Sequence, residues 1–295
     1  MKQAICLLSL ISTVDFYGYR GIDPEPIRKA ILAGPMEASD ALKQRVRSIV
    51  REFTGRDATG VTIVCCDQSG DSALFVGLPG SSSQTFRLNP PPRGDARLSP
   101  EILALHARRE KTEQAAIQRG ASEEDRTQGY SLDQDPASRA LQLRVRQYAL
   151  AHEAEVLNVL ANSKDSEQRA IAAEVLGYVK RSPAQVAALV HASRDPGNAV
   201  RNNATRALGL IAEADPALAR QIPAAPFIEM LRSGVWEDRN KATFLLVDLT
   251  ASRDPELLAA LKAQALDALT EMAGWKDERH APPARIILDR IKGVP

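Results

Sequence analysis

The sequence has little of several residue types, and each scarcity argues against a class of protein. Aromatic side chains make up only 4% of the 295 residues, which disfavours a base-stacking platform or an aromatic carbohydrate groove. Three cysteines are too few for a disulfide scaffold. No run approaches the ~20 apolar residues that span a bilayer, so the sequence predicts no transmembrane segment.

An excess of one charge is also missing. The 38 Lys and Arg residues balance 37 Asp and Glu residues, which leaves a formal charge of +1. A dedicated nucleic-acid or membrane-surface binder carries a field of one sign, and this balance argues against both partners. Hydrophobic residues at 44% and charged residues at 25% are typical of a folded globular chain.

Residues 1–13 form a candidate signal segment. One positive charge precedes the apolar stretch 4–11, and small residues follow it, as in a short secretory signal. This interpretation predicts a periplasmic or secreted protein. The alternative is a buried first strand that continues into Val14 and Phe16, with the cytoplasm as the alternative location.

Residues 14–78 have the mixed pattern of an α+β module. Strand-like alternation comes first, two amphipathic stretches with capping residues follow, and two apolar strand-like runs end the module. The element order is therefore β-α-α-β-β. The predicted elements are a strand from Val14 to Tyr19, helices from Asp23 to Ala33 and from Ser39 to Gly55, and a hairpin with strands at 61–66 and 73–78.

This order, with Gly18 after the first strand, Gly34 between the helices and Gly60 before the hairpin, resembles the POTRA domain of envelope-transport proteins. The resemblance implies a module that offers strand edges and a helix face to partner polypeptides, which is binding by β-augmentation. Residues 79–99, rich in Pro and Ser, predict a linker. Residues 100–135 predict a helix, capped by Ser99, and a polar connection.

Residues 136–295 are helical in pattern and repeat themselves. One run contains Asp195-Pro196, Val200-Arg201 and Leu208-Gly209, and related runs begin near Arg169, Trp236 and Trp275. A period of about 32–42 residues is typical of helical-pair solenoids. The runs resemble HEAT repeats, particularly those of phycobilisome-lyase-like proteins, over about residues 137–292. The whole chain resembles bacterial HEAT-repeat proteins with a POTRA-like module.

Three features of the repeats lead to structural predictions. Asp165 and Asp195 lie in turns, and Arg169 and Arg201 begin the helices that follow them, which predicts a ladder of stacked charge pairs and caps. Gly177 and Gly209 are expected to relieve crowding between neighbouring helices. Trp236 and Trp275 stand at equivalent positions, which favours packing between turns, whereas exposed tryptophans there would be binding anchors.

Motifs for chemistry are scarce. The four histidines are far apart in sequence and lack H-E-x-x-H or C-x-x-C spacing, and no phosphate-binding loop or G-x-S-x-G motif occurs. The acidic run Ser122-Glu123-Glu124-Asp125, near Asp133 and Asp135, is either a cation collector or a solvated loop. We therefore predict no catalytic residue, no cofactor and no metal.

The adjacent pair Cys65 and Cys66 is unusual. One interpretation is a pair of small apolar core residues on a strand. The other is a vicinal disulfide with a redox role, which an oxidising compartment would permit.

The predicted fold class is an α+β N-terminal module (β-α-α-β-β) followed by an all-α HEAT-like α-solenoid. The predicted function is a non-enzymatic, protein-binding scaffold of the bacterial envelope that uses the concave face of the solenoid for a polypeptide partner. The alternative is a HEAT-fold enzyme or nucleic-acid binder, similar to a DNA glycosylase or a chromophore lyase, with arginines such as Arg201, Arg206, Arg232 and Arg239 on phosphates. The candidate partner-binding residues are Asn202, Asn203, Arg206, Trp236, Arg239, Asn240 and Lys241.

Overall fold

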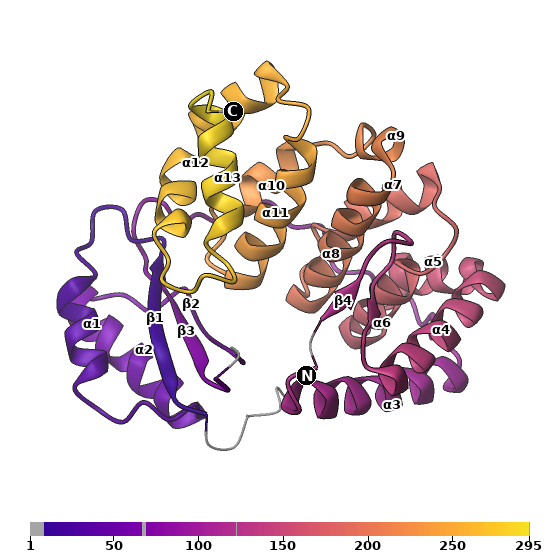
Figure 1. The fold of residues 1–295 in the computed structure, drawn as a ribbon, viewed down its shortest axis with the longest axis horizontal. Coiled ribbons are helices and arrows are strands. Elements are labelled where there is room, and N and C mark those ends of the chain that lie inside the picture. The colour runs from indigo at the N-terminus through magenta and orange to yellow at the C-terminus, as the bar shows by residue number, and fades with distance from the viewer. Residues whose placement is uncertain (1–8, 67–68, 122, 295) are drawn as a thin grey trace. The chain divides into compact units, whose positions relative to one another are not determined.

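A computed structural model describes residues 9–66, 69–121 and 123–294. The described chain divides into two compact units. The sheet unit contains the residues up to Phe86 together with those from Phe227 onward, and the helical unit contains Arg87–Pro226. A small N-terminal sheet region is followed by a long run of helices from residue 100 onward (Figure 1), which confirms the predicted fold class.

The sheet unit begins with the predicted order β-α-α-β-β. Its three strands lie in the order β1-β3-β2, with β1 parallel and β2 antiparallel to β3. The relation to POTRA domains stays a prediction, because the topology alone does not establish a family. The elements are β1 (Ile11–Tyr17), α1 (Glu25–Leu32), α2 (Asp40–Thr54), β2 (Gly60–Val64), β3 (Ser72–Gly77), α10 (Ala225–Met230, which contains the unit boundary), α11 (Trp236–Leu249), α12 (Pro255–Ala273) and α13 (Pro282–Ile291).

Local sequence accounts for the helix ends in this module. The hydroxyl of Ser39 accepts a hydrogen bond from the Leu42 N–H at 3.1 Å and so caps α2. Gly55 ends the same helix with a left-handed φ of 68°. Between these ends, Leu42, Val46 and Val50 are buried in one apolar core with the strands.

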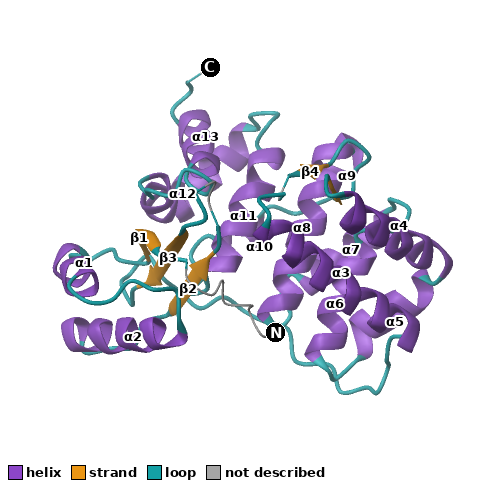
Figure 2. Ribbon diagram, turned by 60° about the horizontal axis from the view of Figure 1, so that its bottom comes forward, coloured by secondary structure: helices purple, strands orange, loops and turns teal. Residues whose placement is uncertain are grey.

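Strand β3 is buried on both faces, and this explains the composition of the sheet unit. Leu74 and Val76 join the core under α1 and α2, whereas Phe75 contacts Trp236 and Trp275. Figure 2 shows α1 and α2 on one side of the strands and α12 on the other. The predicted domain boundaries at residues 78 and 136 divide the chain into consecutive segments. The sheet unit instead joins two segments that are far apart in the sequence.

The helical unit consists mainly of helical hairpins. Helices α3 and α4 pair, as do α5 with α6 and α7 with α8, and the second helices pack α4 on α6 and α6 on α8. The elements are α3 (Pro100–Gln118), β4 (Glu124–Asp125), β5 (Leu132–Asp133), α4 (Pro136–Ala151), α5 (Glu153–Asn162), α6 (Ser166–Leu176), α7 (Pro183–Ala192), α8 (Asn198–Ala214) and α9 (Pro216–Ala219).

Two predicted connections are more ordered than expected. The polar connection after α3 contains the antiparallel pair β4–β5, and we call residues 123–134 the ribbon. The predicted linker contains no helix or strand, but it is hydrogen-bonded. In the helical unit, Asn89 N–H donates to the Arg194 carbonyl and the Gly94 carbonyl accepts from Lys164 N–H, both at 2.7 Å.

The candidate signal segment lies partly outside the described residues, which begin at Ser9. Its last residues, 11–13, are part of β1, as in the buried-strand alternative. Among the described residues, no helix is long and apolar enough to cross a membrane.

Candidate functional site

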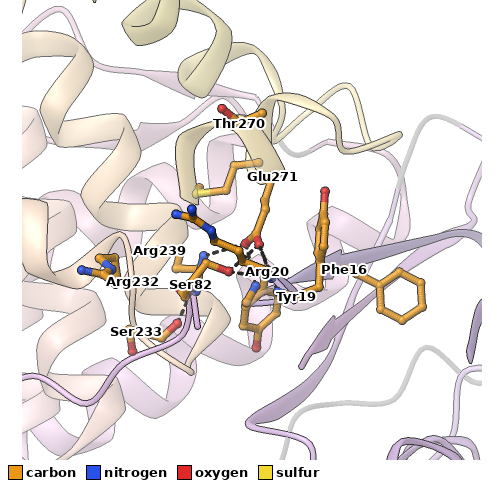
Figure 3. A network of polar contacts seen from close by, with 12 residues as sticks. Phe16, Tyr19, Arg20, Ser82, Arg232, Ser233, Arg239, Thr270 and Glu271 are labelled. Carbon is orange, nitrogen blue, oxygen red and sulfur yellow. Dashed lines mark hydrogen bonds and ion pairs between the residues drawn. The ribbon is translucent and has the colours of Figure 1, made fainter. Parts of the chain in front are cut away.

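A buried polar network of the sheet unit centres on Glu271 of α12, whose carboxylate is 5% exposed (Figure 3). It accepts hydrogen bonds from three consecutive backbone N–H groups that follow β1, those of Gly18 at 2.7 Å, Tyr19 at 3.0 Å and Arg20 at 3.1 Å. The hydroxyl of Ser82 is a fourth donor. Successive N–H groups of this kind form an anion-binding nest, and here a side chain of the same chain fills it.

Arg239 of α11 completes the network and is fully buried. It donates to the carbonyls of Ser233 at 2.6 Å and Ser82 at 2.8 Å, and its Nη1 lies 3.5 Å from Glu271. Burial lowers the pKa of Arg239 to about 10, against the opposing charge of Glu271, so the guanidinium stays charged at neutral pH. The network therefore fixes the segment after β1 to α11 and α12.

A second set of contacts runs in the reverse direction, from the strand to the helices. The buried carboxylate of Asp15 accepts from the N–H groups of Lys276 and Asp277. Burial raises the pKa of Asp15, and these two N–H groups oppose the rise. Trp275 Nε1–H donates to the Phe16 carbonyl at 2.9 Å. Sequence reasoning missed this junction, although the unbroken apolar run of β3 signals a strand covered on both faces.

Three of the candidate partner-binding residues are corrected by the structure. Trp236 is 7% exposed, Arg239 0% and Asn240 2%, so none of them lies on an open surface. The reason is that the start of α11 packs against the sheet, with the ring of Trp236 at 4.9 Å from that of Phe75. Trp275 is also buried, at 2% exposed, so the anchor interpretation is wrong and a packing role is confirmed, although both rings pack on Phe75 of the sheet and not only between turns as predicted.

The other four candidates are half-buried. Asn202, Asn203 and Arg206 lie on α8 in the helical unit, and Lys241 lies on α11 in the sheet unit. Asn203 donates to the Ala170 carbonyl of α6 at 2.9 Å, which ties one second helix to the next. These residues therefore belong to two different units.

The predicted ladder of charges and caps is present, but its pairing differs from the prediction, because Asp165 caps α6 and Arg169 pairs with Asp195. Arg169 makes a buried, two-pronged ion pair with Asp195 of the next turn, at 2.7 and 2.8 Å, and also donates to the Ser163 carbonyl. Arg201 donates to the Asp195 carbonyl at 2.9 Å. The crowding expected at the glycines holds for Gly177, where an added Cβ would lie 3.3 Å from Ala207, and is wrong for Gly209, which has open space.

The ribbon lies against the second helices of the helical unit. Arg206 of α8 pairs with Glu124 and also donates to Ser131 Oγ at 3.2 Å. Arg139 of α4 pairs with Asp125 at 2.9 Å. The acidic run is therefore bound by arginines rather than left as a cation site, and the described residues hold no group of three or more potential metal ligands.

A charged cluster involves α3 and α6 of the helical unit. Arg109 pairs with Glu174 at 2.6 Å and with Glu113, and His106 Nε2 lies 3.0 Å from Glu174. Burial by itself raises the pKa of Glu174, but the charge of Arg109 and the hydrogen bond from His106 outweigh it and lower the pKa to about 2. Glu174 is therefore an ionised acceptor at neutral pH.

The arginines considered for phosphate contacts bind the chain itself. Arg201 and Arg239 are buried, Arg206 pairs with Glu124, and Arg232 donates to the Ser81 carbonyl at 3.3 Å. These four side chains therefore do not form an open row that could contact phosphates, as the nucleic-acid alternative requires.

The cysteine pair lies after β2 and outside the core. Cys65 is exposed, Cys66 is half-buried, and the structure joins them in a vicinal disulfide. The interpretation as two apolar core residues is wrong, because β2 ends at Val64. The redox role stays a prediction.

Comparison with known protein families matches residues 153–247 to HEAT repeats. The hairpins within that range are therefore similar to HEAT repeats, and HEAT repeats generally serve in protein-interaction scaffolds and are typically non-catalytic. No curated protein matches the chain.

Proposed function

We propose that the protein is a non-enzymatic scaffold of the bacterial envelope, and that its HEAT repeats bind a polypeptide partner along their concave face. The observation that supports this proposal is that the helical unit already holds an extended polypeptide, residues 87–99 of its own chain. Main-chain hydrogen bonds at Asn89 and Gly94 hold that segment, and its Leu98 N–H donates to the side-chain oxygen of Gln168. Hydrogen bonds of the same kind can hold a segment of another protein.

The second helices of the sheet unit offer a surface for such a partner. Phe244 of α11 is 37% exposed and Ile286 of α13 is 40% exposed, and the two helices pack together. Lys241 lies one turn before Phe244 on α11. Contiguous exposed apolar side chains are typical of protein-interaction surfaces.

Site-specific photo-crosslinking tests the proposal in producing cells. A photoreactive phenylalanine analogue replaces Phe244, and in a matched control it replaces Leu266, which is similarly exposed at 38% but lies on the first helix of its pair. We expect a discrete protein adduct at position 244 that is absent at 266. Identical adducts at both positions, or none at 244, contradict a partner site on the second helices. Cell fractionation tests the envelope location, which a wholly cytoplasmic protein would contradict.

A further inference from the structure

The ribbon is an insertion in the first helical pair. Residues 119–135 connect α3 to α4, whereas residues 163–165 connect α5 to α6 and residues 193–197 connect α7 to α8. Connections within helical bundles are normally short, and long ones are frequently functional. A two-stranded ribbon is also marginal in isolation, so the helices must hold it in place.

Four arginines of the helical unit hold the ribbon, each at a different point. Besides the pairs of Arg206 with Glu124 and Arg139 with Asp125, Arg181 donates to the Gln128 carbonyl at 3.0 Å. The guanidinium of Arg146 lies 4.1 Å from the ring centre of Tyr130. The four arginines therefore bind two acidic side chains, one main-chain carbonyl and one aromatic ring. Any acidic peptide with an aromatic residue has the same groups.

The two strands of the ribbon are held differently. In β5, Leu132 is 1% exposed, and Asp133 N–H donates to the Gln142 side chain of α4 at 2.6 Å. In β4, neither residue is buried, and Glu124 and Asp125 are held by charge pairs whose side chains are 22–33% exposed. Such partly solvated pairs contribute little each, so β4 is the strand that can leave.

We propose that β4 is an internal ligand, and that an acidic, extended segment of a partner protein displaces it, pairs with β5 and forms ion pairs with Arg206 and Arg139. This inference rests on the proposed scaffold function and names the chemistry of one partner. The tethered strand competes at an effective concentration in the millimolar range. If the β4 segment binds its own site with an intrinsic Kd of about 10 μM, any partner peptide is suppressed about 100-fold while β4 is in place.

The test uses the full-length protein and a fluorescein-labelled peptide with the sequence of residues 123–128, measured by fluorescence anisotropy. The variant Glu124→Ala/Asp125→Ala removes the charges of the internal competitor and keeps the arginines. We expect it to bind the peptide at least tenfold more tightly than the wild type. The matched control Glu123→Ala, which alters an exposed neighbour in the same segment, should bind as the wild type does.

Adding Arg206→Ala to the double variant should weaken binding at least tenfold, and a peptide of scrambled order should bind less tightly. The inference is overturned if the double variant, folded by circular dichroism, binds no more tightly than the wild type. It is also overturned if Arg206→Ala has no effect, or if the variant binds duplex DNA and not the peptide.

A second measurement needs no variant. Hydrogen–deuterium exchange of the wild type with saturating peptide should accelerate at β4 and stay slow at β5, and unchanged exchange at β4 contradicts displacement. Crosslinking at Phe244 together with failure of the peptide assay would remove this inference and leave the scaffold function. Tight peptide binding without a crosslink at Phe244 would remove the proposed surface on α11 and α13.

Discussion

Replacing Glu271 with Gln tests whether the buried network stabilises the sheet unit. Oε1 of Glu271 accepts from the N–H groups of Tyr19 and Arg20, and Oε2 faces the Gly18 N–H and Arg239. An amide keeps the shape but turns one acceptor into a donor. Its least unfavourable orientation places the NH₂ at the Oε2 position, where it meets two other donors.

The expected loss follows from those two orphaned groups. Hydrogen bonds to a charged group contribute about 1.5–3 kcal/mol each, and Arg239 would keep a buried charge without its partner. We expect Glu271→Gln to lower the free energy of unfolding by about 3–5 kcal/mol. Urea unfolding followed by tryptophan fluorescence measures it locally, because both tryptophans of the chain, Trp236 and Trp275, lie in the sheet unit.

The matched control is Glu278→Gln. Glu278 also pairs with an arginine, Arg285, but its side chain is 68% exposed, so its loss should cost far less than the loss of Glu271. Exposed ion pairs contribute at most about 1 kcal/mol. If the free energy of unfolding of Glu271→Gln lies within that range of the wild-type value, the reasoning is refuted.

Three further predictions concern the helical unit, and each is measured by chemical unfolding followed by circular dichroism. Arg169→Ala should cost about 3–5 kcal/mol, because it leaves the buried carboxylate of Asp195 without its partner, and a cost below 1 kcal/mol contradicts a buried ladder. The lowered pKa of Glu174 means that its stabilisation is complete above the usual value of 4.5 and is lost as the pH falls toward 2. Glu174→Gln should flatten the stability profile in that window, and an unchanged acid limb would oppose this assignment. Gly209→Ala should stabilise the helix by about 0.5–1 kcal/mol, whereas Gly177→Ala should not, and equal gains would contradict the close contact at Gly177.

Much of the fold was predictable because its signals are local. Ser39 and Gly55 bound α2 as their capping chemistry requires, and the recurring Asp and Arg residues predict a ladder, although Arg169 pairs with Asp195 and not with Asp165. The candidate site was less predictable. Trp236, Arg239 and Asn240 have the spacing of one helix face. That spacing does not show whether a sheet packs against the face or leaves it exposed to solvent.

The amino-acid sequence by itself determined the β-α-α-β-β order of the first module, the helical pairs and the recurrence of charged residues at their turns. The physical reason is that caps, periodicity and repeat spacing act over a few residues or between adjacent repeats. Only the tertiary structure decided that the N-terminal sheet and the last helices form one unit, and that the ribbon packs against α8. Glu271 meets Gly18 across 253 positions of sequence, and Arg206 meets Glu124 across 82. Contacts of that separation depend on where whole elements pack, which no local pattern records.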